Sequence, residues 1–224
     1  EGESADWFFY VNGILANTGA LGYNLRGGDI EQWDFHDWSF HAFIPAIIGH
    51  FPEPFRHGYR GNICPTIVVY DEGLGETAQA LADRLKGLGV KDVFVQNVKG
   101  LSQESKKQSN LIILGTANHE LISELNRIYG KLGLYAYFRD GSLVILNSKG
   151  EVTGEYEAGI GLIQATQNPW NPKGIGACEN VVWMVSGRDK AGVKAAVEIL
   201  TNRWDEIRYL YAIAIVNGEV IKIP

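Results

Sequence analysis

Two aspartates and two histidines occur within eight residues near the start of the chain, namely Asp34, His36, Asp37 and His41. Carboxylate and imidazole groups are ligands that zinc and other transition metals take from proteins. Asp34, His36 and His41 are therefore a candidate metal site, which would support a metal-dependent hydrolase. The alternative is structural, because His36 and Asp37 at the end of a strand can cap it by hydrogen-bonding the next segment.

Aromatic residues gather in the same region and offer a second kind of site, a platform for a flat ligand or a sugar. They are Trp7, Phe9, Trp33, Phe35, Trp38 and Phe40. Because successive strand residues point to opposite faces, at most half of them share a surface. We expect Phe9 and Phe35 in the core, and Trp33 and Trp38 are open to either role.

A small β-rich module must position these side chains. Residues 7–11 are aromatic and β-branched, as strands prefer, and Asn12-Gly13 is the pair that type I′ hairpin turns favour. A second turn at residues 26–29 leads into a strand over residues 30–35, which brings His36 to its end.

This module resembles a known family. The segments W-F-F-Y-V-N-G, Y-N-L-R-G-G-D and W-D-F-H-D-W are similar to domains related to the C-terminal β-grasp domain of transcobalamin and intrinsic factor, over about residues 5 to 60. In the vertebrate relatives that domain covers one face of cobalamin. The resemblance therefore implies a corrinoid or another small flat ligand, and the candidate contacts are Trp33, His36, Trp38, Tyr10 and Asn12. The same resemblance makes four histidines candidate ligands of a corrinoid cobalt, namely His36, His41, His50 and His57.

Members of that family usually carry a strand pair and a helix ahead of the W-F-F-Y-V-N-G strand, whereas here six residues precede Trp7. We expect that processing removed that half, that the sequence starts downstream of it, or that another polypeptide supplies it. An open sheet edge would otherwise remain, and open edges invite strand addition. We therefore expect a partner chain or self-association through the N-terminal β-edge.

Strands and helices alternate from residue 66 onward, which is typical of a sheet covered by helices on both sides. The expected strands are 66–70, 92–98, 111–114, 135–138, 142–146, 152–156, 181–185, 211–216 and 220–223, the last two as a hairpin around Asn217-Gly218. Helices are expected over 76–85 and 191–200 and after the turn at 115–118, where Leu121, Leu125 and Ile128 share a face, and residues 159–165 form a helix or a strand. We predict an α+β fold followed by α/β. Residues 1–62 form a partial β-grasp module and residues 63–224 a Rossmann-like domain with a mostly parallel sheet.

The second region also carries a resemblance, over about residues 105 to 200. The segments N-L-I-I-L-G-T, N-P-W-N-P and V-V-W-M-V-S-G-R-D-K-A-G-V-K-A-A-V-E-I-L are similar to a module of prokaryotic surface-layer proteins and to parts of periplasmic cellulose-synthase subunits. This implies a noncatalytic role at the cell surface.

Composition narrows the classes of partner. The formal charge is −6, and the 20 basic residues are scattered, which argues against nucleic acid. The apolar runs are shorter than the roughly 20 residues that span a bilayer, so we expect no transmembrane segment. Cys64 and Cys178 each precede a strand-like run, so they form a disulfide or stay separate buried thiols. An even cysteine count and a first residue other than Met are compatible with a removed leader and an extracytoplasmic protein.

Catalytic motifs are missing from the sequence. It has no G-x-S-x-G segment, no cysteine with a credible histidine partner and no recognisable acid–base pair of carboxylates. We predict a noncatalytic extracytoplasmic binding protein with no cofactor other than a possible corrinoid. The alternatives are a structural subunit of a surface layer or filament, and the metal-dependent hydrolase.

Overall fold

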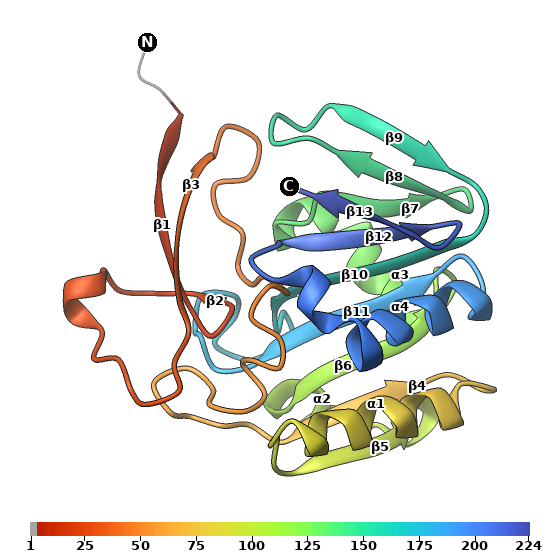
Figure 1. Ribbon diagram of the computed structural model, residues 1–224, viewed down its shortest axis with the longest axis horizontal. Helices are drawn as coiled ribbons and strands as arrows, with labels where there is room; N and C mark the ends of the chain where they lie inside the picture. The colour runs from red at the N-terminus through yellow and green to blue at the C-terminus, as the bar shows by residue number, and fades with distance from the viewer. Residues whose placement is uncertain (1–3) are drawn as a thin grey trace.

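A two-stranded ribbon forms the N-terminal part of the computed structural model, which describes residues 4–224 (Figure 1). Strand β1 (Ala5–Val11) pairs antiparallel with β3 (Glu31–Asp37) along its whole length, and the short β2 (Ile14–Leu15) pairs only with the end of β1. The predicted turn is confirmed, because Asn12 and Gly13 have φ of 52° and 75°. The sheet order is β2-β1-β3, so β3 is an edge strand.

A seven-stranded mixed sheet forms the centre of the molecule, in the order β13-β12-β10-β11-β6-β4-β5. Its strands are β4 (Thr66–Tyr70), β5 (Val93–Asn97), β6 (Asn110–Thr116), β10 (Ile160–Gln167), β11 (Val181–Gly187), β12 (Ala212–Val216) and β13 (Glu219–Ile223). The prediction of a mostly parallel sheet is wrong. Only the three pairs β4–β5, β4–β6 and β6–β11 are parallel, and the other three are antiparallel. The connections from β10 to β11 and from β12 to β13 contain no helix, the second being the Asn217–Gly218 turn, and both pairs run antiparallel, whereas the helix Lys190–Asn202 lies between β11 and β12.

Helices cover one face of this sheet and a helix with a second sheet covers the other. On the first face α1 (Gly75–Gly87) and α4 (Lys190–Asn202) lie side by side (Figure 1). On the opposite face lie α3 (Glu120–Arg127) and the antiparallel sheet of β7 (Ala136–Arg139), β8 (Ser142–Leu146) and β9 (Val152–Tyr156). Four short 3-10 helices span Ala20–Gly22, Val98–Gly100, Tyr129–Leu132 and Trp204–Ile207.

Local sequence explains how these helices begin and which face they bury. In α1 the buried residues are Ala78, Leu81, Ala82 and Leu85, at the spacing of one helical face. The side chain of Asp189 caps α4 by accepting from Gly192 N. Another helix, α2 (Gln103–Gln108), lies between β5 and β6, where no helix was expected, and Ser102 caps it.

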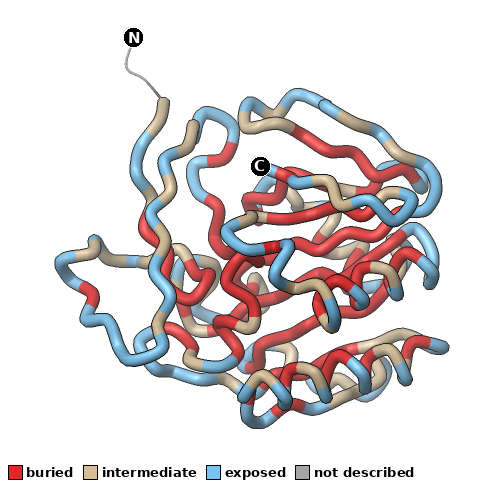
Figure 2. The backbone as a smooth tube through the Cα atoms, in the orientation of Figure 1, coloured by how far each residue is buried: buried red, intermediate tan, exposed pale blue. Residues whose placement is uncertain are grey.

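The hydrophobic core is continuous across the predicted domain boundary at residues 62–63. Its largest cluster joins Phe9, Ile48 and Phe55 to Trp183 and Ile213 of the central sheet and its neighbours. The connecting segment 44–59 is largely buried (Figure 2). The connector thus ties the ribbon to the α/β body.

No helix in the described range 4–224 is long and apolar enough to cross a membrane, in line with the prediction. The fold as a whole is a mixed α and β arrangement with several sheets.

Candidate functional site

Alternation along the β1–β3 ribbon separates its side chains into two faces. On the outer face Trp7 pairs with Phe35, and Phe9 pairs with Trp33; their ring centroids are 5.3 and 5.1 Å apart. The inner face carries Phe8, Tyr10, Asp34 and His36. These two faces have different surroundings.

The outer face is aromatic and largely uncovered. Trp7 is 61% exposed, Trp33 49% and Phe35 55%. The expectation that Phe35 lies in the core is therefore wrong, whereas Phe9 is buried, as predicted, and its ring lies edge-on to Tyr23. A shallow groove of about 530 Å³ runs between the rings of Trp7, Phe9 and Trp33 on one side and residues 15–20 on the other. Three large exposed aromatic side chains on one ribbon form a patch of the kind that marks an interaction site.

Within residues 4–224, β3 also has backbone N–H and C=O groups that no strand pairs with, along the edge that faces away from β1. Asn12 N donates to Ile30 O, and Trp38 N donates to Ser4 O. With the register of the pair, these two bonds mean that even-numbered residues of β3 bond to β1 and odd-numbered ones turn away from it. Trp33 and Phe35 thus present unpaired backbone groups as well as exposed rings, since within residues 4–224 the only strand paired with β3 is β1.

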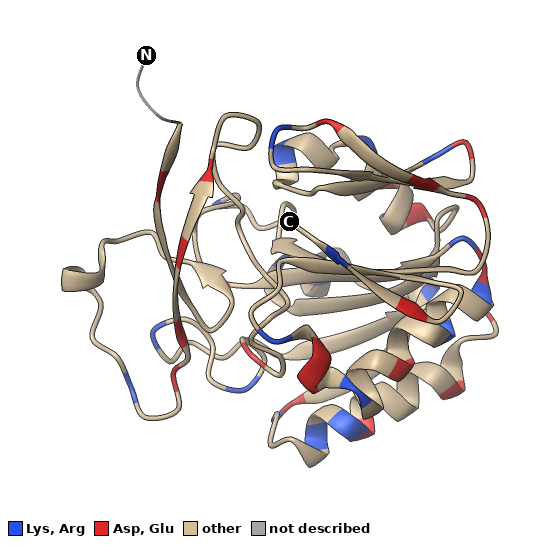
Figure 3. Ribbon diagram, turned by 45° about the horizontal axis from the view of Figure 1, so that its top comes forward, with Lys and Arg blue, Asp and Glu red and all other residues tan. Residues whose placement is uncertain are grey.

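Charge on the ribbon has one sign. Acidic residues occur at Asp6, Glu31, Asp34 and Asp37, and no Lys or Arg precedes Arg26. Figure 3 shows the acidic bands along both strands and no basic ones. Glu31 and Asp37 lie at the two ends of β3 on its outer face, so acidic groups flank the aromatic pair on both sides.

The inner face of the ribbon is clamped onto the α/β body by a polar cluster. Tyr211, directly before β12, donates its hydroxyl proton to Asp34 Oδ2, and His36 Nδ1 contacts the same oxygen. Tyr211 Oη also lies 3.0 Å from His36 Nδ1, and the His36 ring stacks on Phe8 with 3.9 Å between centroids. Burial and the bond to Asp34 raise the pKa of Tyr211 far above its ordinary value, so it stays protonated.

Access to this cluster is restricted, which limits its chemistry. The His36 side chain is only 9% exposed, and its Nε2 is buried without a hydrogen-bond partner among the described residues. The arrangement therefore attaches the ribbon rather than presenting a reactive group to solvent.

The predicted metal set does not come together. His41 is buried apart from the pair, where its Nε2 bonds Leu134 O at 2.9 Å. Within residues 4–224 no group of three or more His, Cys, Asp or Glu side chains is arranged to hold a metal ion. Asp34 and His36 are in contact, but Tyr211 is their third partner.

The predicted contacts of a flat ligand do not share one surface either. Trp33 lies on the outer face and His36 on the inner face, while Trp38 follows the end of β3 and is partly exposed. Tyr10 is fully buried and donates to Ile44 O at 3.0 Å. Asn12 is also buried, and its side chain bonds Asp29, Gly58 and Ile30 around the turn.

The two cysteines are free, so of the two alternatives that the sequence left open the structure has the separate thiols. Cys64 Sγ donates to Glu179 O at 3.4 Å, whereas Cys178 Sγ donates to Leu15 O at 3.2 Å. They precede β4 and β11, and these strands are not neighbours because β6 lies between them. Burial raises the pKa of both thiols, to about 11 for Cys178.

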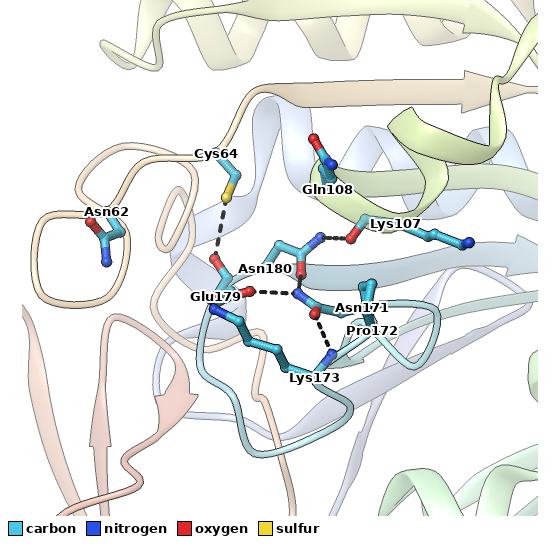
Figure 4. Close-up of a pocket in the computed structure, with 9 residues that line it drawn as sticks. All are labelled: Asn62, Cys64, Lys107, Gln108, Asn171, Pro172, Lys173, Glu179 and Asn180. Atoms are coloured by element: carbon cyan, nitrogen blue, oxygen red, sulfur yellow. Dashed lines mark hydrogen bonds and ion pairs between the residues drawn. The ribbon is translucent and has the colours of Figure 1, made fainter.

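A second site, a cavity of about 410 Å³, lies where α2 ends, beside the 171–180 loop (Figure 4). The residues that line it are Asn62, Cys64, Lys107, Gln108, Asn171, Pro172, Lys173, Glu179 and Asn180. The sequence does not reveal this cavity, because its walls come from three segments far apart in the chain. No local motif marks either the cavity or Tyr211.

Comparison with known proteins assigns neither site: no family model matches the chain, and no curated protein matches it.

Proposed function

We propose that this chain is a noncatalytic binding protein that captures an extended segment of a partner polypeptide by strand addition to β3. The observation that carries the proposal is the coincidence, at Trp33 and Phe35, of exposed aromatic rings with outward backbone groups. Strand addition draws affinity from main-chain hydrogen bonds and specificity from alternate side chains. The two resemblances noted in the sequence favour a partial β-grasp module, a Rossmann-like body and a setting outside the cytoplasm.

Charge determines which strand fits. A second copy paired antiparallel about Asp34 would place Glu31 opposite Asp37, and a parallel copy would oppose each acid to itself. Like charges directly opposite one another destabilise a strand pair. A partner strand with a basic residue at each end and apolar residues between them would place its basic residues opposite the two acids of β3. Its apolar residues would then lie opposite the two aromatic rings. We therefore assign the edge to a basic partner strand rather than to a second copy.

The experiment uses the peptide Lys-Thr-Val-Thr-Val-Thr-Lys, with Glu-Thr-Val-Thr-Val-Thr-Glu as its charge-reversed control. Tryptophan fluorescence should report binding of the basic peptide only, weakened by salt because the ion pairs are exposed. Methylating the peptide's backbone nitrogens should abolish binding, because it removes main-chain pairing while leaving the side chains.

Matched variants locate the site. Phe35→Thr removes a ring that is 55% exposed, which is about 100 Å² of the roughly 200 Å² that a Phe can bury. Burial of apolar surface contributes about 25 cal/mol per Å², and the Thr side chain retains part of that surface. The substitution should therefore weaken peptide binding by about 2 kcal/mol, or roughly thirtyfold. Phe94→Thr is the control, because Phe94 is also 55% exposed and lies on β5, an edge strand of the central sheet.

Two outcomes count against the proposal. If Phe35→Thr and Phe94→Thr weaken peptide binding equally, the peptide does not bind specifically at β3. A dimer in light scattering that Phe35→Thr dissociates would make a second copy the occupant of the edge.

A further inference from the structure

The cavity beside α2 differs from the ribbon in its chemistry, because four of its nine lining residues carry primary amides. They are Asn62, Gln108, Asn171 and Asn180. Its volume of about 410 Å³ lies within the range of small-molecule sites. A primary amide offers donors and an acceptor at once, as a hydroxyl group does.

The base of the cavity is fixed in place before any ligand arrives. The Asn171 side-chain amide donates to Glu179 Oε2 at 3.0 Å and to Asn180 Oδ1 at 2.8 Å. Asn180 donates in turn to Lys107 O and Ser109 O, at 3.0 and 2.7 Å. Both asparagines are buried, so their amide planes keep one orientation.

The rim of the cavity carries the groups that remain available. The side chains of Asn62 and Gln108 are exposed and make no hydrogen bond to the described residues 4–224. They come from different segments, with Asn62 on the loop ahead of β4 and Gln108 at the end of α2 (Figure 4). A ligand in the cavity would therefore meet unengaged amides from two sides.

The cavity carries one cation beyond its internal ion pair. Lys173 pairs with Glu179, and the Lys107 ammonium lines the cavity without an ion pair in the described part of the chain. A phosphate or a carboxylate only accepts hydrogen bonds and would leave the amide oxygens of Asn62 and Gln108 without a donor, whereas a hydroxyl group can donate to these oxygens and accept from the amides and the ammonium. We propose that this cavity binds a neutral saccharide unit, independently of the strand-addition edge.

The test is a titration of isotopically labelled protein with methyl glucoside, methyl galactoside, methyl mannoside and N-acetylglucosamine, followed by side-chain amide signals in NMR spectra. At least one sugar should shift the signals of Asn62, Gln108 and Asn171 saturably. Removing one amide should weaken binding by about two- to tenfold, and the double variant Asn62→Ala/Gln108→Ala by about tenfold or more. Gln103→Ala is the control, because Gln103 is exposed on the first turn of the same helix and does not line the cavity.

The Cys64 thiol gives a second readout that does not depend on the variants, since it lines the cavity. The sugar that shifts the amides should slow alkylation of Cys64 by iodoacetamide. The proposal is overturned if none of the four sugars produces saturable shifts, or if binding persists unchanged in the double variant. Either result leaves strand addition at β3 untouched, because that edge is tested with peptides.

Discussion

Buried His50 is expected to make the stability of this protein fall in mild acid. Its Nδ1 accepts from Gly13 N at 2.8 Å and its Nε2 lies 3.0 Å from Gln32 Oε1, so the neutral ring with a proton on Nε2 satisfies both neighbours. A second proton on Nδ1 would face the N–H of Gly13. Burial lowers the pKa of His50 from 6.5 to about 4.

The sign and size of the effect follow from this difference. The unfolded chain takes up the proton as the pH falls below 6.5, whereas the folded chain takes it up only near 4. The stabilisation is complete above pH 6.5 and is lost as the pH falls toward 4. A difference of about 2.5 between the pKa values corresponds to about 3.4 kcal/mol in the acid limit, of which about 2 kcal/mol is lost by about pH 5.

Urea unfolding at pH 8 and pH 5 measures this loss in the wild type and in His50→Asn. The Asn side-chain oxygen can still accept from Gly13 N but does not titrate, so the variant should lose about 2 kcal/mol less than the wild type between these pH values. His41 and His119, whose pKa burial also lowers, are present in both proteins and cancel.

Ile48→Val is the control for a general loss of stability, because it removes a buried methylene and no titrating group. It should lower the free energy of unfolding by about 1 kcal/mol at both pH values. Equal acid losses in wild type and His50→Asn would refute the reasoning.

Further expectations concern the helices, the ribbon clamp and the thiols. Gly192→Ala should destabilise by about 3 kcal/mol or more in urea unfolding, because its Cβ would lie 1.7 Å from a backbone oxygen of β10. Gly87→Ala, in a helix with open space around the added carbon, should stabilise by up to about 1 kcal/mol. Tyr211→Phe should lower the free energy of unfolding by about 1.5 to 3 kcal/mol, the cost of a hydrogen bond to a charged group. A thiol reagent should modify Cys64 in the native protein and Cys178 only after unfolding, as mass spectrometry of the labelled peptides can show.

Local patterns were enough to predict much of the fold. Asn12-Gly13 predicted the first hairpin turn because both positions need positive φ. The apolar spacing of residues 76–85 and 191–200 predicted α1 and α4, since each needs one buried face.

Long-range pairing was beyond the sequence. Alternation predicted two faces for residues 31–37 but not which one the body covers, so Phe35 was assigned to the core. The cover comes from Tyr211, some 175 residues from His36 along the chain. The antiparallel pairing of β10 with β11 and β12 was missed for the same reason, because periodicity gives a strand its length but not its neighbour, whereas the Asn217-Gly218 turn predicted the antiparallel pair β12–β13.

The ribbon is fastened at its inner face while its outer edge is free, and this arrangement has a mechanical consequence. A strand added along β3 would lie parallel to the ribbon axis, with its hydrogen bonds perpendicular to that axis. Tension along the strand would load all of those bonds together, whereas tension across it would break them one after another. The joint would therefore resist pulling in one direction and unzip in the other, and the tyrosine–aspartate–histidine clamp would carry the load into the central sheet.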